Sequence, residues 1–438
     1  MKKMKKFLVI TLLISIAVTL FSCNTPSEVS NPDVSNNAIG TDNITIEQQT
    51  LLKNLASEWN SSTVTKDSDF RLRQYDFATK LYKAFSITSE NENMMFSPLS
   101  IQLAFAMQTN GAKGETKTEL ENFLGGVPME QINTELKNFV SSLSSANDYK
   151  IGIANSIWMR NNALELKESF KKVNTDYYDA ELYSEPFDNK TAEKINNWVS
   201  ENTDEMIEKI VEIIDPLNVM YLINAIVFDA KWANPVDDYS IKEDEFTTIS
   251  GEKKKVEMMR SEEQSFIITD DATGFVKPYK NNKYSFVALL PNEDVEIKDY
   301  INSLNAQKLC SIMDNIQNGL VKMYFPKFEY EYTIEMRSIF EALGVKRAFS
   351  PIEADLTDMA TSEYGNIYIS SALHKTYISV DNEGTRAAAV TAIVGSVDSG
   401  SMPIYQLTIT LDRPFVYMII ENETKLPIFI GTVMDIGE

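Results

Sequence analysis

The chain has 438 residues, 43% of them hydrophobic, and carries 63 acidic against 41 basic side chains, a formal net charge of -22. This hydrophobic content supports a large packed core and argues against global disorder. The negative charge repels nucleic acid, and the sequence has no lysine and arginine stripe with interleaved aromatic residues, so we expect no nucleic-acid partner.

Residues 1–23 have the pattern of an export signal. A basic segment, "MKKMKK", precedes the apolar run "FLVITLLISIAVTLF". The run ends at "LFSC", which resembles a bacterial lipobox, so Cys23 would carry a diacylglycerol thioether. Because Phe21 is bulkier than the usual lipobox residue, an uncleaved anchor and an ordinary secretory signal remain as alternatives. No later stretch is long and apolar enough to span a bilayer, so we expect an exported, lipid-anchored protein at the cell surface or facing the periplasm.

The segment 24–66 is rich in Asn, Ser, Thr and Asp and contains Pro26 and Pro32. This composition predicts a flexible tether between the anchor and the folded domain, which we expect to occupy residues 67–438. The later part of the segment, "EQQTLLKNLASEW", is compatible with a turn or two of helix.

In the folded region, helical patterns come first and strand patterns follow. Apolar residues recur at helical spacing in the segments 69–85, 97–125, 168–180 and 191–211. Residues 149–160 alternate as in a strand, and residues 219–232 are apolar on both faces, which predicts a central strand. Further strands are expected at 245–250, 254–259, 265–271, 274–279, 284–291, 320–334, 405–420 and 426–435. This order predicts an α+β fold built around large antiparallel sheets.

Cysteine usage predicts a domain without an internal disulfide. If Cys23 is lipidated, Cys310 is the only remaining thiol. It lies in the helical pattern at 297–317, where we expect it to be a small buried hydrophobic residue.

The sequence offers little catalytic chemistry. His374 is the only histidine, which excludes most zinc sites, and no G-x-S-x-G elbow is present to supply the nucleophile of a triad. The letters "SGEK" at Ser250–Lys253 match S-x-x-K, but they lie in a glycine-containing turn without companion motifs. Phosphate-binding glycine loops and a calcium loop are missing from the sequence. We therefore expect no metal, no cofactor and no enzymatic activity.

The segment 381–400, "DNEGTRAAAVTAIVGSVDSG", combines features that no single conformation explains. Its three consecutive alanines favour a helix, the β-branched residues that follow favour a strand, and the glycines mark turns. The combination indicates a segment that adopts two conformations.

Five separated motifs resemble those of the serpin family, in the same order and at the expected separations. They are "NMMFSPLSI", "GAKGETKTEL", "LINAIVFDAKW", "SALHKTYISVDNEGTRAAAVTA" and "LDRPFVYMIIENETKLPIFIGTV". The resemblance covers residues 67–438. It implies an α+β serpin fold, in which helices pack on three antiparallel or mixed β-sheets and a reactive-centre loop at 382–403 is exposed.

The resemblance also implies a monomeric suicide-substrate inhibitor of serine or cysteine proteases. The protease cleaves the loop and is acylated by it, and the upstream half of the loop then enters the central sheet as a new strand, carrying the trapped protease with it in a covalent complex. A non-inhibitory serpin that acts as a surface binding or carrier protein is the alternative. The small residues of the loop argue against that alternative, because a carrier does not need loop insertion.

The implied hinge of this loop comprises Gly384, Thr385, Arg386, Ala387, Ala388, Ala389 and Val390. After insertion, successive residues would alternate between the core and the solvent. Thr385 would face the core and Arg386 the solvent, because burying a charge costs several kcal/mol. Gly384 would serve as the pivot through its wide dihedral range.

Carried over residue by residue, the family's shutter corresponds to Ser97, Ser100, Asn224 and His374. The shutter is a hydrogen-bond cluster beneath the point where the sheet opens. Trp232 matches the tryptophan of the breach, where the loop first enters. Two departures concern charge: Asn382 and Arg386 stand where the family usually has Glu, so a breach ion pair through residue 382 is in doubt.

Counting from Gly384 at the family's usual spacing places the cleaved bond at Asp398–Ser399. An acidic residue there would select proteases with a basic primary pocket. A shift by one residue gives Val397–Asp398 and an elastase-like target, and Asp398 as a simple turn residue remains a further alternative, because loop length varies.

Overall fold

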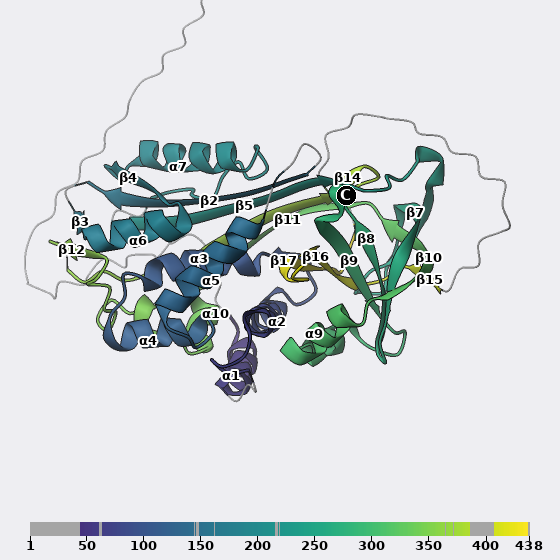
Figure 1. The fold of residues 1–438 in the computed structure, drawn as a ribbon, viewed down its shortest axis with the longest axis horizontal. Helices are drawn as coiled ribbons and strands as arrows, with labels where there is room; N and C mark the ends of the chain where they lie inside the picture. The colour runs from purple at the N-terminus through teal and green to yellow at the C-terminus, as the bar shows by residue number, and fades with distance from the viewer. Residues whose placement is uncertain are drawn as a thin grey trace, which may run out of the picture. The chain divides into compact units, whose positions relative to one another are not determined.

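The computed structural model describes residues 44–436 apart from 61–63, 144, 146–148, 162, 215–217, 219, 364, 371 and 386–406. Helices and sheets share one large hydrophobic core in this part, and the expected α+β class is confirmed (Figure 1). The helices are α1 (Ile46–Asn60), α2 (Phe70–Ser89), α3 (Pro98–Thr109), α4 (Gly114–Phe123), α5 (Met129–Ser142), α6 (Glu168–Tyr178), α7 (Asn189–Asn202), α8 (Ile297–Ser303), α9 (Ala306–Asp314) and α10 (Arg337–Ala342). No helix within these described ranges is both long and apolar enough to cross a bilayer.

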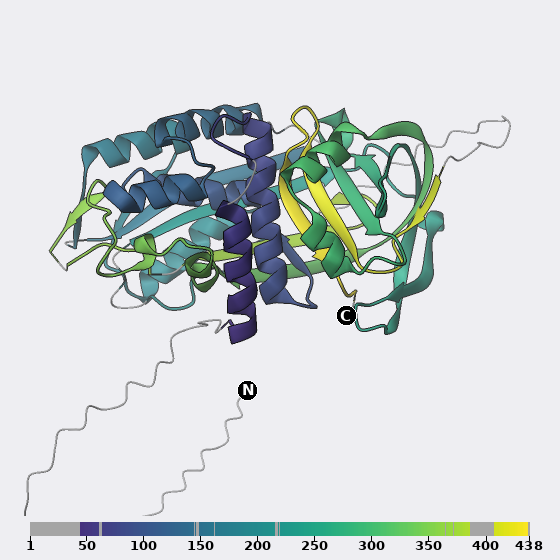
Figure 2. The ribbon, with the colours of Figure 1, turned by 90° about the horizontal axis from the view of Figure 1, so that it is seen from below.

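The segment around residue 50 corrects the predicted tether. Residues Ile46–Asn60 form α1, which runs beside α2 (Figure 2). Its apolar positions 52, 55, 56 and 59 repeat at helical spacing, so they lie on one face. Leu52 and Leu55 are buried in the core, and the Trp59 ring stacks on Phe123 at 5.6 Å. The tether prediction for 24–66 is therefore wrong from residue 46 to residue 60, and the folded domain begins before residue 67. Residues 1–43, with Cys23, lie outside the described residues.

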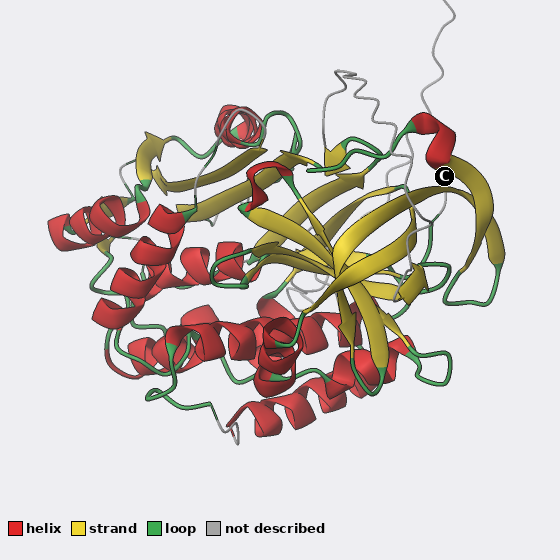
Figure 3. Cartoon of the chain, turned by 45° about the vertical axis from the view of Figure 1, so that its right-hand side comes forward, coloured by secondary structure: helices red, strands yellow, loops and turns green. Residues whose placement is uncertain are grey.

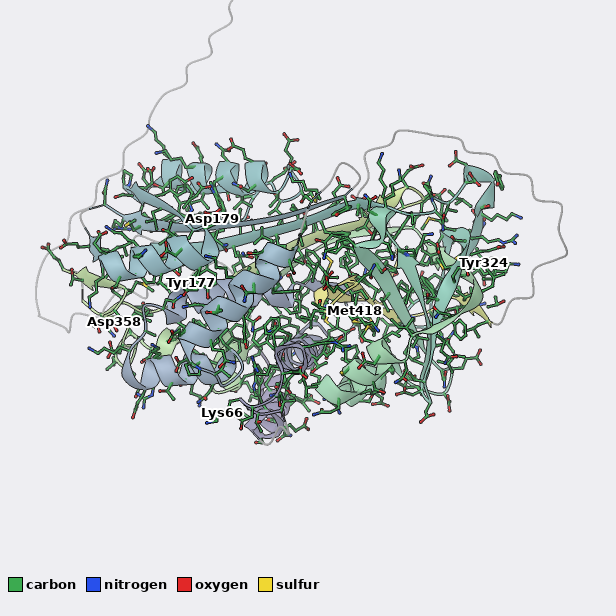
Figure 4. All side chains as sticks on the ribbon, viewed as in Figure 1. Lys66, Tyr177, Asp179, Tyr324, Asp358 and Met418 are labelled. Atoms are coloured by element: carbon green, nitrogen blue, oxygen red, sulfur yellow. The ribbon has the colours of Figure 1, made fainter. Side chains whose placement is uncertain are left out.

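The larger sheet has nine strands. Its order is β1 (Met94–Phe96), β17 (Pro427–Val433), β16 (Phe415–Glu421), β9 (Tyr284–Pro291), β8 (Ala272–Pro278), β7 (Lys253–Ile268), β10 (Gln317–Pro326) and β15 (Leu407–Thr410), with β6 (Ile241–Thr247) paired to β7. Figure 3 shows most helices gathered on one side of the strands. All eight residues of β9 are buried, and Met418 of β16 lies among the packed side chains of the core (Figure 4).

The smaller sheet has six strands, and it contains the predicted central strand. Its order is β11 (Phe328–Glu335), β13 (Leu373–Val380), β14 (Gly384–Thr385), β5 (Met220–Lys231), β2 (Tyr149–Arg160) and β4 (Glu181–Glu185). A two-stranded sheet of β12 (Ala360–Ser362) and β3 (Leu164–Leu166) completes the set of three in the described chain. The helix α7 lies over one face of the six-stranded sheet and α3 lies under the other (Figure 1).

Cys310 on α9 is only half-buried, so the prediction of a buried position is wrong. Its thiol is 3.5 Å from Oδ2 of Asp314, one helical turn later. Partial burial and this carboxylate together raise the pKa of the thiol.

Candidate functional site

The most distinctive feature of the six-stranded sheet is the strand β14, at the last described residues before the reactive-centre loop. The strand β14 is only two residues long and pairs antiparallel with β13 on one side and with β5 on the other. Within the described residues, β5 and β13 are joined through β14 and nowhere else. As far as the chain is described, the facing edges of these two strands have no neighbouring strand beyond Thr385. Such open edges are templates for a further strand.

A narrow pocket continues from Thr385 along this gap. Ile226 and Phe228 of β5 line one wall, and Ile378 of β13 lines the other. Met206 and Ile207, from the segment after α7, also line it. The slot between β5 and β13 is thus lined by apolar side chains, which suits the burial of small uncharged residues.

The backbone leading into β14 is held by a network around Trp232. The side chain of Asp381 accepts hydrogen bonds from the N–H groups of Glu383 and Gly384, at 2.7 and 3.0 Å. The backbone N–H of Trp232 donates to the carbonyl of Glu383 at 2.8 Å, and its indole N–H donates to the carbonyl of Asp381 at 2.8 Å. The tryptophan predicted for the breach therefore lies directly beside the start of the loop.

Gly384 is required for a reason that the sequence analysis did not give. Its φ angle is outside the left-handed region, so the conformation seen here does not itself require glycine. A Cβ at this position would lie 2.1 Å from the carbonyl oxygen of Ala230 and 2.9 Å from the Cα of Lys231. The absence of a side chain allows the loop to approach the backbone of β5 closely.

Thr385 is buried, with 2% of its surface exposed. Its hydroxyl is hydrogen-bonded to the hydroxyl of Tyr279, a residue that the sequence analysis missed. The Tyr279 ring stacks on Trp232, with 4.5 Å between centroids and 11° between planes. A threonine, an aromatic pair and the end of β5 thus close the slot at the point where the loop enters.

Asn382 is neutral and is held at the breach by hydrogen bonds. Its side-chain amide donates a hydrogen bond to a carboxylate oxygen of Asp238 at 3.4 Å. Its backbone carbonyl accepts a hydrogen bond from the N–H of Val236 at 2.8 Å. A buried ion pair lies nearby instead, between Lys277 and Glu263 at 2.8 Å, with the Lys277 Nζ 5.3 Å from the Trp232 ring. Burial lowers the pKa of Lys277, although the attraction of Glu263 opposes this effect. No local pattern predicts this pair, because its partners lie on different strands.

The four residues predicted for the shutter lie on both sides of the slot and are linked at its floor, where the N–H of Ser100 donates to the side chain of Ser97 at 3.1 Å. On the β5 side, the Ser100 hydroxyl donates to Asn224, whose amide donates to Asn155 of β2 at 2.7 Å. On the β13 side, His374 accepts a hydrogen bond at Nε2 from the backbone N–H of Ser97 at 3.1 Å. Ser97 also caps α3, which keeps both serines at the floor of the slot. Asn155 was missed because nothing in its local sequence marks it.

The buried imidazole of His374 should make stability depend on pH. Burial lowers the pKa of His374 to about 4, against ~6.5 for an unfolded histidine. The unfolded chain then binds more protons between these values, so this stabilisation is complete above the unfolded pKa and is lost as pH falls toward 4. From pH 7 to pH 5 we expect a loss of ~2 kcal/mol in the free energy of unfolding from this group alone.

Urea unfolding at pH 7 and pH 5 measures this loss, with His374→Gln as the matched variant. Glutamine can still accept a hydrogen bond from Ser97 but does not titrate. Between pH 7 and pH 5, the free energy of unfolding of the variant should fall by ~2 kcal/mol less than that of the parent. Titration of the carboxylates contributes equally to the two proteins, so it cancels in this difference. An identical loss in the two proteins would contradict the assignment.

Several predicted residues lie outside the described residues. They are Arg386, Ala387, Ala388, Ala389 and Val390 of the hinge and Val397, Asp398 and Ser399 around the proposed cleavage point. Ser250 and Lys253 lie where a turn joins β6 to β7; Ser250 bonds to Thr248 and Lys253 pairs with Glu245, so the two do not form a catalytic pair. In the described part of the chain, no group of three or more His, Cys, Asp or Glu side chains could hold a metal ion.

Comparisons with known proteins agree with this geometry. A family model described as "Serpin (serine protease inhibitor)" matches residues 73–436. Serpin-Z7 from Hordeum vulgare is 31% identical over 398 residues, which cover 84% of this chain and 98% of that protein. Alpha-1-antitrypsin 1-2 from Mus musculus is 31% identical over 380 residues, covering 82% and 87%. The crystal structure of the thermophilic serpin tengpin in its native state matches with a TM-score of 0.79 and 44% identity, covering 85% of this chain and 96% of that chain.

Proposed function

Because the chain belongs to the serpin family, we propose that it is a suicide-substrate inhibitor of serine or cysteine endopeptidases. Members of the family are generally protease inhibitors rather than enzymes. In the proposed reaction, the serine or cysteine of the protease attacks a peptide bond in the loop that follows Thr385. The upstream part of the loop becomes an acyl ester or thioester of the protease, and the downstream part is released as a free amine. The loop then inserts between β5 and β13 before water hydrolyses the ester, and the protease stays covalently bound.

The observation that carries this proposal is the slot between β5 and β13 with β14 at its head. The loop has already entered the sheet by two residues and pairs with both neighbours. If insertion continued in the same register, Thr391 would come opposite both Asn224 and His374. A threonine would then lie between Asn224 and His374 of the predicted shutter, where a small side chain with a hydroxyl fits. The alanines before it would meet the apolar walls of the slot.

The proposed insertion is strong enough to deform a protease. About a dozen new backbone hydrogen bonds, at ~1 kcal/mol net each, would contribute on the order of 10 kcal/mol. Apolar burial would add to this value. The whole stability of a typical protease domain is only ~5–15 kcal/mol.

For the cleaved bond we propose Asp398–Ser399, with Val397–Asp398 as the alternative. The first bond would select proteases with a basic primary pocket, and the second would select elastase-like proteases.

We also propose export and lipid anchoring through Cys23, on the sequence pattern of residues 1–23. Mass spectrometry of the N-terminal peptide of the mature protein tests the anchor, which an unmodified Cys23 would rule out.

A panel of purified proteases tests the inhibitory function. The protein is incubated with each protease and run on a denaturing gel, where a covalent complex appears as a band of the summed mass. Mass spectrometry of the released C-terminal peptide identifies the cleaved bond. Cleavage of the loop by every protease without any complex would refute inhibition and favour the carrier alternative.

A further inference from the structure

We propose that Tyr279 is a positioning residue that holds the hinge inside the sheet through Thr385 and so biases the loop toward insertion. The consequence for trapping rests on the proposed inhibitory function. The consequence for the intact protein, a hinge held in the sheet, does not.

The Tyr279 side chain is rigidly placed. It is fully buried, and its ring is stacked on Trp232 and packed edge-on against Phe228 of β5 at 4.9 Å. The backbone of Tyr279 is also bridged to Trp232 and donates its N–H to the carbonyl of Tyr284 at 3.0 Å. The ring therefore cannot move away with the loop, so its hydroxyl is a fixed point at the head of the slot.

The hydroxyl of Tyr279 depends on Thr385 for its hydrogen bond. Among the described residues, the only hydrogen bond that it makes is to the Thr385 hydroxyl. Burial raises the pKa of Tyr279 far above its ordinary value, so the group remains a neutral hydroxyl at working pH. If the hinge left the sheet, Thr385 would reach water, but Tyr279 would stay buried with an unsatisfied polar group. A buried unsatisfied group is costly, so the bond favours the inserted hinge.

Removing the Tyr279 hydroxyl reverses this preference. In Tyr279→Phe, the inserted Thr385 would have a buried hydroxyl without its partner, whereas the expelled Thr385 would be hydrated. The expelled hinge would therefore gain population. After cleavage, an expelled hinge must first re-enter the sheet, which leaves more time for water to hydrolyse the acyl ester.

The test on the intact protein is hydrogen–deuterium exchange of the peptide that contains residues 381–385, measured without any protease. Exchange should be about tenfold faster in Tyr279→Phe, which corresponds to ~1.4 kcal/mol. Tyr82→Phe is the matched control, because Tyr82 is also fully buried and its hydroxyl is also paired with a threonine, Thr432. Exchange of the hinge peptide should not change in Tyr82→Phe.

A double variant separates the proposed role from a general loss of packing. Thr385→Val alone leaves the Tyr279 hydroxyl unsatisfied, but Tyr279→Phe with Thr385→Val gives an apolar pair without an orphaned group. Exchange in the double variant should return to within about twofold of the parent. Exchange that is unchanged in Tyr279→Phe, or that stays tenfold faster in the double variant, overturns the proposal.

The same variants report on trapping. The stoichiometry of inhibition is the number of inhibitor molecules consumed for each protease molecule trapped. In Tyr279→Phe, the excess of this number over one should rise up to about tenfold. In the double variant, the excess should return toward the value of the parent. If the hinge peptide exchanges faster in Tyr279→Phe but the stoichiometry of inhibition is unchanged, the proposed bias toward insertion is wrong. If no variant traps a protease while the hinge of Tyr279→Phe exchanges faster, the hold on the hinge is confirmed and the inhibitory function is refuted.

Discussion

Replacing Thr385 with Arg should convert the inhibitor into a substrate. The side chain at 385 is 2% exposed and points into a site formed by Tyr279 and the end of β5. Insertion would have to bury a guanidinium there, which costs several kcal/mol. A cost of ~4 kcal/mol slows insertion by a factor of roughly a thousand, and hydrolysis of the acyl ester then wins. The loop should still be cleaved at an unchanged rate, but the covalent band on a denaturing gel should disappear.

Thr361→Arg is the matched control for this variant. Thr361 is an exposed threonine on β12, which lies at the other end of the domain from β14 (Figure 1). The same substitution there should leave the covalent complex intact. Trapping by Thr385→Arg at the level of the parent would show that the register of β14 does not continue into the inserted loop.

Local patterns were enough to predict the class of the fold and the strand that borders the slot. The run at 219–232 is apolar on both faces, and it became β5 between β14 and β2. The same logic failed at α1, where the composition of a long polar segment hid the apolar face that Leu52 and Leu55 share. The average composition of the 43 residues 24–66 is polar and hides the apolar face of the helix. The spacing of apolar residues within the 15 residues of α1 reveals that face.

Contacts between strands could not be predicted from local patterns. Tyr279 reaches Thr385 only because the end of β8 lies beside the hinge in the folded chain, and Glu263 reaches Lys277 because β7 pairs antiparallel with β8. The pivot role predicted for Gly384 did not include its close approach to β5. A close approach to Ala230 is a property of the pairing with β5, and no one-dimensional pattern contains it.

Cleavage of the loop should make the protein more stable rather than less. Among the residues that the structure describes, the facing edges of β5 and β13 have no neighbouring strand beyond Thr385, and the released loop would supply one strand to both. With on the order of 10 kcal/mol gained from new hydrogen bonds, the melting temperature should rise by roughly 10–20 °C, since a large domain gains only a degree or two per kcal/mol. Scanning calorimetry of the intact and the cleaved protein measures the rise, and any protease that cuts within 397–403 prepares the sample, because the cut then leaves the upstream half of the loop whole.

Thr385→Arg again provides the control for this experiment, because the cut loop of the variant cannot insert without burying a charge. Its melting temperature after cleavage should rise much less than that of the parent. A protein whose edges stay open gains nothing from a broken peptide bond and loses the constraint of a closed loop. If the cleaved parent melts at the same temperature as the intact protein or below it, the slot does not receive the loop, and the proposed trapping of a protease has no source of free energy.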